Sequence, residues 1–171
     1  TEAVSSIPRA AVANILGAPG IRRDAAGTPV AAAEVLAQIQ VPQRSGGNAI
    51  NVTLRGVGKS EALLRPEIHL IGGRMFQPGL HELIVGRNAE TRYGGLGVGS
   101  HLSFQNGDWA VVGVFDSTGP SALDSQVLTD AETLLSAYQR DAFQSITVRL
   151  DDPASLERLK RAVAADPTLH V

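Results

Sequence analysis

Apolar and polar residues alternate along two stretches in the first third of the chain. Residues 35–41 alternate between aliphatic and smaller or polar side chains, and residues 50–54 do the same. A period of two is typical of a strand with one buried face. Gly46-Gly47 lies between the two stretches, so the pattern predicts an antiparallel pair joined by a hairpin-type connection.

A first helix is predicted before these strands. Ser5-Ser6 offers a hydroxyl cap, and Pro8 suits the first turn of a helix. Apolar residues then recur at helical spacing as far as Leu16, and Pro19-Gly20 ends the segment.

The last third of the chain returns to strands and helices. Thr129 and Glu132 have the spacing of a capping box, which predicts the start of a helix. Residues 145–150 alternate as a half-buried strand. Asp152-Pro153 then predicts the cap of a final helix. The residues that this helix would bury are Leu156, Leu159 and Val163.

The middle of the chain is rich in glycine and in short apolar runs. Pro78-Gly79 marks a turn, and residues 82–85 form a short apolar run that predicts a strand. Asn106-Gly107 is the preferred two-residue hairpin turn, because both of its positions must take left-handed dihedrals. With these two residues at the centre of the turn, Phe104 would lie opposite Trp109.

The order of these elements predicts the fold class. Strands and helices alternate at both ends of the chain and surround a middle that consists of strands. This arrangement predicts an α+β domain with a β-rich insertion.

The composition excludes several classes of protein. Fifteen Lys and Arg residues against seventeen Asp and Glu give a net charge of −2, and the basic residues are scattered, so no nucleic-acid-binding surface is expected. The sequence contains no apolar run near the roughly 20 residues that cross a bilayer. Cysteine is absent, which excludes thiolate catalysis and disulfides. No signal peptide is recognisable from Thr1 onward, and we expect the chain to be a domain of a longer protein.

Two stretches begin like known motifs but lack a required residue. Gly56–Ser60 ends like a phosphate-binding loop, yet Thr53 stands where the pattern needs a glycine. His81-Glu82 begins like the helix of a zinc protease, yet Val85 occupies the position of the second histidine. We therefore expect no catalytic residue, no cofactor and no metal site.

The segment Gly73–Arg87 resembles a signature of the MacB-like periplasmic core domains of ABC-transporter permeases, which are related to the lipoprotein-release and FtsX groups. In that signature Gly-Arg-x-Phe is followed by a turn, an acidic residue and a Val/Ile strand that ends in glycine. Gly95–Ser100 is similar to the family's Leu-x-Val-Gly turn, and Trp109–Phe115 to its Val-Val-Gly-Val strand. Leu123–Asp130 resembles a further segment of one subgroup, with two departures.

The resemblance implies a porter-like α/β subdomain that is interrupted by a small β-rich insertion subdomain. Residues 1–72 and 122–171 would form the porter-like subdomain, and residues 73–121 the insertion. The arginines of the signature are either contact points with a partner or solvated residues beside glycine turns. The signature or interface residues are Gly73, Arg74, Phe76, Gly79, Glu82, Gly86, Arg87 and Trp109.

The resemblance also implies a location and a set of partners. Such a domain lies on the outer face of a bacterial inner membrane, between two transmembrane helices of a permease. ATP is hydrolysed by a separate cytoplasmic subunit or domain, and the domain relays that change outward without catalysing a reaction. A second permease copy and a periplasmic adaptor are the expected partners outside the membrane, and contact with the membrane is expected only through helices outside this sequence.

Two other functions stay open on the sequence alone. A free-standing periplasmic module that binds a peptide or small molecule would need a sizeable concave pocket with a few convergent polar groups. A serine hydrolase would need the hydroxyl of Ser121 or Ser125 beside a histidine that folding brings close.

Overall fold

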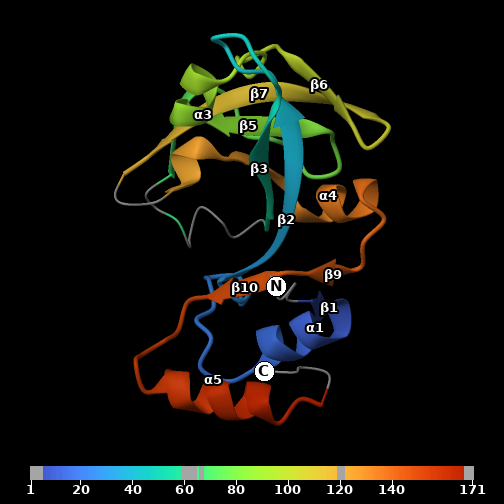
Figure 1. The fold of residues 1–171 in the computed structure, drawn as a ribbon. Helices are drawn as coiled ribbons and strands as arrows, with labels where there is room; N and C mark the ends of the chain where they lie inside the picture. The colour runs from blue at the N-terminus through green and yellow to red at the C-terminus, as the bar shows by residue number, and fades with distance from the viewer. Residues whose placement is uncertain (1–5, 59–64, 66–67, 119–121, 168–171) are drawn as a thin grey trace.

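The computed structural model describes residues 6–58, 65, 68–118 and 122–167 (Figure 1). Strands outnumber helices among the elements of the described residues. In chain order the elements are β1 (Ile7–Pro8), α1 (Arg9–Gly17), β2 (Ala31–Val41), β3 (Ile50–Val57), β4 (Ile68–Gly73), β5 (Glu82–Gly86), α3 (Arg87–Arg92), β6 (His101–Phe104), β7 (Gly107–Ser117), the 3-10 helix η1 (Ala122–Ser125), β8 (Val127–Asp130), α4 (Ala131–Ala137), β9 (Ala142–Phe143), β10 (Ser145–Val148) and α5 (Ser155–Ala164).

One mixed sheet of eight strands dominates the fold. Its strand order is β10-β2-β3-β8-β5-β7-β4, and β6 also pairs with β7. β3 pairs in parallel with β8, and β5 in parallel with β7, while the other pairs of this sheet are antiparallel. A separate two-stranded sheet joins β1 to β9. The predicted α+β class is therefore confirmed.

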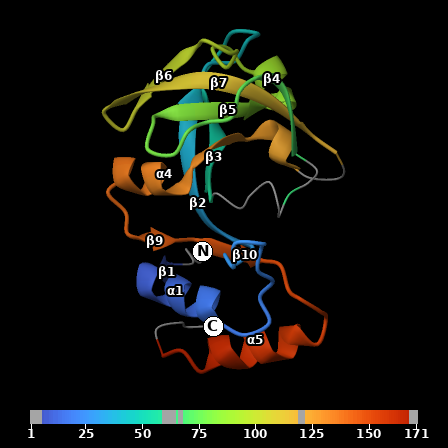
Figure 2. The ribbon, with the colours of Figure 1, turned by 180° about the vertical axis from the view of Figure 1, so that it is seen from behind.

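The elements gather into two lobes that are stacked along β2 (Figures 1 and 2). The helical lobe contains β1, α1, β9, β10 and α5, and the sheet lobe contains the elements from β3 to α4. The first residues of β2, 31–34, pair with β10, and residues 35–41 pair with β3. β2 thus belongs to both lobes and connects them without a break.

The predicted antiparallel pair is formed by β2 and β3. Its register runs from Val41 opposite Ile50 to Val35 opposite Gly56, with a loop of residues 42–49 between the strands. Val35 and Leu54 are fully buried. At Gly56 a Cβ atom would lie 2.8 Å from the Cα of Ala131, so glycine lets α4 pack directly on β3. Lys59 and Ser60, the last residues of the segment that ends like a phosphate-binding loop, lie outside the described residues.

Two apolar clusters cover the two faces of the sheet. Strand β5 is buried along its whole length, and its successive side chains enter different clusters, because side chains alternate across a sheet. Leu83 and Val85 belong to the larger cluster, which contains Trp109 and residues of α4. Ile84 belongs to the smaller one, with Val57, Phe115, Leu123 and Leu128.

The hairpin between β6 and β7 has a different register from the predicted one. The two residues with positive φ are Gln105 (+49°) and Asn106 (+55°), so Phe104 pairs with Gly107 and Leu102 lies opposite Trp109. Gly107 lies in β7, where a side chain would not fit, since a Cβ there would lie 2.8 Å from the ring of His81. The predicted pairing of Phe104 with Trp109 is wrong, although the two rings still stack diagonally at 4.8 Å.

The start of α4 also differs from the prediction. The cap is Asp130, whose carboxylate accepts hydrogen bonds from the backbone N–H and the hydroxyl of Thr133 at 2.9 and 2.7 Å. Thr129 is buried and donates its hydroxyl proton to the carbonyl of Glu82 at 2.8 Å. Glu132 is exposed and pairs with Arg9. The predicted capping box of Thr129 and Glu132 is therefore wrong, because both side chains have tertiary partners.

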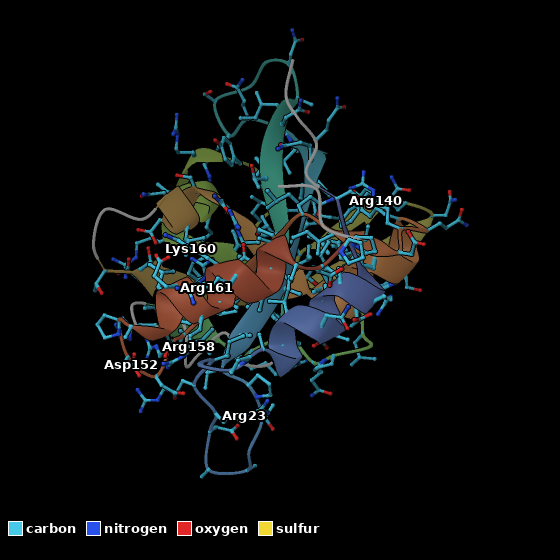
Figure 3. The ribbon with its side chains drawn as sticks, turned by 90° about the horizontal axis from the view of Figure 1, so that it is seen from below. Arg23, Arg140, Asp152, Arg158, Lys160 and Arg161 are labelled. Carbon is cyan, nitrogen blue, oxygen red and sulfur yellow. The ribbon has the colours of Figure 1, made fainter. Side chains whose placement is uncertain are left out.

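The final helix is less buried than its pattern indicates. The helix begins at Ser155 with Ala154 at its cap position and no side-chain cap bond, so the predicted cap, Asp152-Pro153, lies in the turn before it. The Ser155 N–H donates to Asp152 at 2.8 Å, which lowers the pKa of Asp152. Leu159 and Val163 are half-buried, but Leu156 is 44% exposed, so its predicted burial is wrong. Seen from below, α5 lies beside α1, and Arg158, Lys160 and Arg161 project from it (Figure 3). In the described residues α1 is the helix against which α5 packs, so one side of α5 stays open.

The first helix begins later than predicted. α1 starts at Arg9 with Pro8 at its cap position, and Ser5 lies outside the described residues. The predicted subdomain boundaries at residues 72 and 122 stay a prediction. The sheet is continuous across them, since β4 pairs with β7, and β8 lies between β3 and β5.

We expect Asp130→Ala to lower the free energy of unfolding by about 1–2 kcal/mol, because the first turn of α4 then loses its cap. Asp130→Asn is the matched control, since an amide oxygen can still accept from the Thr133 N–H. Urea titration followed by circular dichroism measures both variants. An equal loss in the two variants would contradict the capping role.

Candidate functional site

The signature segment begins where β4 ends against β7. Gly73 has a φ of +68°, and a Cβ on it would lie 2.1 Å from the carbonyl oxygen of Val112. Both the positive φ and the close approach of the Val112 carbonyl require glycine at position 73. The next N–H, that of Arg74, donates to the Val112 carbonyl at 2.9 Å. This contact fixes where the Arg74 side chain leaves the sheet.

Arg74 forms a bidentate ion pair with Glu82. The two guanidinium nitrogens donate to the carboxylate oxygens at 2.7 and 2.5 Å, and the N–H of Gln77 donates to the same carboxylate at 2.9 Å. Glu82 is only 8% exposed, whereas the side chain of Arg74 is 52% exposed. The hydrogen bonds from Arg74 lower the pKa of Glu82 and outweigh the effect of burial, which raises it. The pair closes the turn that leads into β5.

The turn itself is held between the smaller cluster and α4. Phe76 packs against the smaller apolar cluster. Gly79, with a φ of +84°, donates its N–H to the hydroxyl of Thr133 at 2.9 Å. The turn is therefore attached to the first turn of α4, where Asp130 already binds Thr133.

The second glycine–arginine pair lies at the other end of β5. A Cβ on Gly86 would lie 2.3 Å from the carbonyl oxygen of Asp124, and the Gly86 N–H donates to the Gln126 carbonyl at 2.9 Å. Glycine at this position lets η1 pack against the strand end. Arg87 lies 3.4 Å from the carboxylate of Asp116.

Trp109 is fully buried between two other rings. His81 stacks on it with a centroid distance of 4.2 Å, and Phe104 stacks at 4.8 Å. The signature residues therefore shape the sheet lobe: they hold a turn, a strand end and a ring stack. A role for any of them at an interface stays a prediction.

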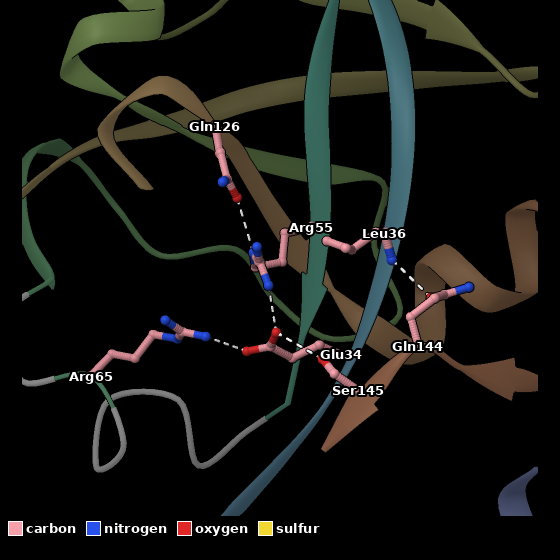
Figure 4. Close-up of polar contacts among 7 residues, drawn as sticks. All are labelled: Glu34, Leu36, Arg55, Arg65, Gln126, Gln144 and Ser145. Atoms are coloured by element: carbon pink, nitrogen blue, oxygen red, sulfur yellow. Dashed lines mark hydrogen bonds and ion pairs between the residues drawn. The ribbon is translucent and has the colours of Figure 1, made fainter. Parts of the chain in front are cut away.

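A second polar site lies at the junction of the two lobes, and sequence reasoning missed it (Figure 4). Its centre is Glu34 on β2, which is only 2% exposed. Arg55 donates to its carboxylate at 2.5 Å, the Ser145 hydroxyl lies 3.2 Å away, and Arg65 binds the other oxygen. A buried carboxylate needs such partners, because burial of an unpaired charge is costly.

The same network extends to the start of β8 and to the residue before β10. The Nε of Arg55 donates to the side chain of Gln126 at 2.9 Å, just before β8. The side-chain oxygen of Gln144 accepts the backbone N–H of Leu36 at 2.9 Å, and the backbone N–H of Gln144 donates to the carbonyl of Glu34 at 2.9 Å. The Glu34 network, defined as Glu34, Arg55, Arg65, Gln126, Gln144 and Ser145, thus connects β2, β3, β8 and β10.

The only trace of this site in the sequence is a break in the alternation along β2. Glu34 and Val35 are adjacent and both buried, so the strict period of two fails between them. At this point β2 changes partners from β10 to β3, and both of its faces are covered. A charged residue at the edge of an alternating run is typical of an exposed position, so its burial could not be inferred from the pattern.

Only some of the residues that sequence reasoning tested for chemistry lie in the described part of the chain. Ser121 and His170 lie outside the described residues, and the hydroxyl of Ser125 makes no hydrogen bond with any described histidine. His101 pairs with Asp108 at 2.7 Å on the exposed hairpin of β6 and β7. Among the residues that the structure describes, no group of three or more His, Asp or Glu side chains could hold a metal ion.

The described part of the surface carries several hollows. One has a volume of about 510 Å³ and lies between the turn at Pro78-Gly79 and α4, where His81 and Asp130 line it. Another, of about 250 Å³, is lined mostly by apolar residues of β4 and its neighbours. A third, of about 360 Å³, lies between α1 and α4.

One family model matches almost the whole chain. The profile described as "MacB-like periplasmic core domain" matches residues 5–166. No curated protein sequence matches the chain. Within the described residues, no helix is long and apolar enough to span a membrane.

Two solved structures have a similar fold. The extracellular domain of the noncanonical ABC-type transporter YknZ from Gram-positive bacteria has a TM-score of 0.70 and 14% identity, over 93% of this chain and 81% of that one. The periplasmic region of MacB from Actinobacillus actinomycetemcomitans has a TM-score of 0.68 and 14% identity, over 95% of this chain and 73% of that one.

We expect Glu34→Gln to lower the free energy of unfolding by about 3 kcal/mol, because the amide N–H₂ then faces a guanidinium, donor against donor, in a buried site. Glu157→Gln is the matched control, since its pair with Lys160 is exposed on one helix and should be worth less than about 0.5 kcal/mol. Equal losses in the two variants, measured by urea titration, would show that the network is not a strong constraint.

The Arg74–Glu82 pair should respond asymmetrically to mutation. Arg74→Met leaves the nearly buried carboxylate of Glu82 with one donor, the backbone N–H of Gln77. Glu82→Gln leaves the half-exposed guanidinium of Arg74, which water can solvate. We therefore expect Arg74→Met to lower the melting temperature more than Glu82→Gln does. The reverse order would contradict the proposed geometry.

The same pair should make the domain sensitive to acid. Because the folded-state pKa of Glu82 lies below its ordinary value of 4.5, the pair stabilises the fold above that pH and loses its contribution as the pH falls through the lowered pKa. The wild-type melting temperature should thus fall more steeply between about pH 5 and pH 3 than that of Glu82→Gln. Parallel curves would contradict the assignment.

Proposed function

The chain belongs to the MacB-like periplasmic core domain family, and on that premise we propose that it relays ATP-driven conformational change outside the membrane. The family consists of extracytoplasmic domains of ABC-type transporter permeases. The proposed setting is the outer face of a bacterial inner membrane, with ATP hydrolysed by a cytoplasmic subunit or domain. In this proposal the domain itself performs no chemical step.

The family match over residues 5–166 is the observation that carries the proposal. The structure supports it through the continuity of β2, which runs through both lobes and has eleven residues, a length of roughly 35 Å at ~3.3 Å per residue. The buried Glu34 network ties this strand to its neighbours at the junction of the lobes. A relay needs such a connected body rather than a reactive group.

The arrangement of the lobes supports an orientation for the domain. The first and last elements, β1 and α5, both lie in the helical lobe (Figures 1 and 2). Membrane helices on either side of the domain would then join this lobe, and the sheet lobe would extend away from the bilayer. A second permease copy or an adaptor would contact the sheet lobe.

The experiment uses the full permease with its ATPase, with any cysteine outside this sequence replaced, and a single label at Asn48→Cys. Asn48 is exposed in the loop between β2 and β3, and the chain has no native cysteine. A maleimide that cannot cross membranes should label this site in intact cells. Labelling only after lysis would contradict the extracytoplasmic location.

The same site then tests the relay. Energy transfer from a dye at Asn48→Cys to acceptor lipids of the outer leaflet should change between ADP and ATP with vanadate, because the tip of the sheet lobe moves. An ATPase-inactive partner subunit is the control and should abolish the change. Equal transfer in both nucleotide states of the active complex would overturn the relay.

A further inference from the structure

A cleft separates the two lobes on the side away from the Glu34 network. Its volume is about 360 Å³, and it lies between Val12 and Leu16 of α1 and Ala131 of α4, with Phe143 at one side. The apolar side chains of Val12 and Phe143 also reach the large cluster of the sheet lobe. The lobes therefore contact each other through apolar side chains. Such contacts are non-directional and do not fix the angle between the lobes.

A polar contact between α1 and α4 spans this cleft and restricts the angle between the lobes. Arg9 of α1 donates from both of its terminal nitrogens to the carboxylate of Glu132 on α4, at 2.8 and 2.5 Å. A bidentate pair of this kind fixes both distance and orientation. The two side chains are 52% and 57% exposed, so the pair is weak and is screened by salt.

The opposite side of the junction is far harder to open. Glu34, Arg55 and Arg65 are buried or nearly so, with exposed side-chain fractions of 3%, 17% and 20%. Separating such a pair would leave a charge in the interior without a partner. Any change of angle between the lobes should therefore turn about the Glu34 network and break the Arg9–Glu132 pair first.

A second carboxylate also acts on the charge of Arg9. Asp141, which precedes β9, interacts electrostatically with Arg9 and, after Glu132, raises the pKa of its guanidinium. Glu132 belongs to the sheet lobe, whereas Asp141 lies on the segment that leads into the helical lobe.

We propose that the two lobes form a hinge, with the Glu34 network as its pivot and the Arg9–Glu132 pair as a breakable latch. The inference concerns motion within one domain and does not depend on the parent permease or its transport activity. It would let the angle between the lobes respond to a pull on the helical lobe.

The test measures the distance between the lobes in the isolated chain. Spin labels at Asn48→Cys in the sheet lobe and Ala164→Cys at the end of α5 report the angle, since both positions are exposed and the chain has no other cysteine. With the latch intact we expect one narrow distance distribution. In Glu132→Gln the distribution should become about twofold wider or shift, because minor angles become populated.

Matched variants separate the latch from general destabilisation. The charge swap R9E/E132R should restore the narrow distribution, and Glu157→Gln, which removes a similar exposed pair within α5, should leave it unchanged. Glu132→Gln is preferred to a change at Arg9, because the guanidinium also lies over the ring of Phe143. The melting temperature of each variant confirms that it is folded.

The hinge is overturned if Glu132→Gln, folded, gives the same distribution as the intact latch, or if the charge swap fails to restore it. Raising the salt concentration to about 1 M should widen the distribution of the intact latch, because the pair is exposed. Identical distributions at low and high salt would also count against the latch. Since no membrane or nucleotide is present, neither result decides whether the domain relays ATP-driven change.

Discussion

A buried carboxylate between two arginines holds the two lobes of this domain together. Glu34 lies where β2 leaves β10 and begins to pair with β3, and its oxygens bind Arg55 and Arg65. Because none of these charges can be separated from its partners without a large cost, the junction has one preferred arrangement. The continuity of the sheet across the lobes depends on this arrangement.

The signature of the family has a structural explanation in this chain. Its glycines allow backbone approaches that a Cβ would prevent, at Gly73 against β7 and at Gly86 against η1. Its arginine and acidic residue, Arg74 and Glu82, form a pair that closes the turn before β5. These contacts stabilise the sheet lobe as one body, and such a body is what a relay of force requires.

The two sides of the junction differ in strength, and this difference links structure to the proposed function. The Glu34 network is buried, whereas the Arg9–Glu132 pair is exposed and its neighbours in the cleft are apolar. A domain that is stiff along β2 can transmit a pull. If the Arg9–Glu132 pair breaks, the angle between its two lobes can still change.

The alternation of residues 35–41 and 50–54 determined the β2–β3 pair, because a period of two is a local property of the chain. A local pattern carries no information about contacts between residues that are distant in the sequence. Those contacts are known only from the tertiary structure. The hairpin of β6 and β7 turns at Gln105-Asn106 and places Gly107 in a strand against the ring of His81, and Leu156 stays exposed on α5. Ion pairs with two arginines distant in the sequence compensate for the burial of the Glu34 carboxylate, and no pattern along β2 could indicate them.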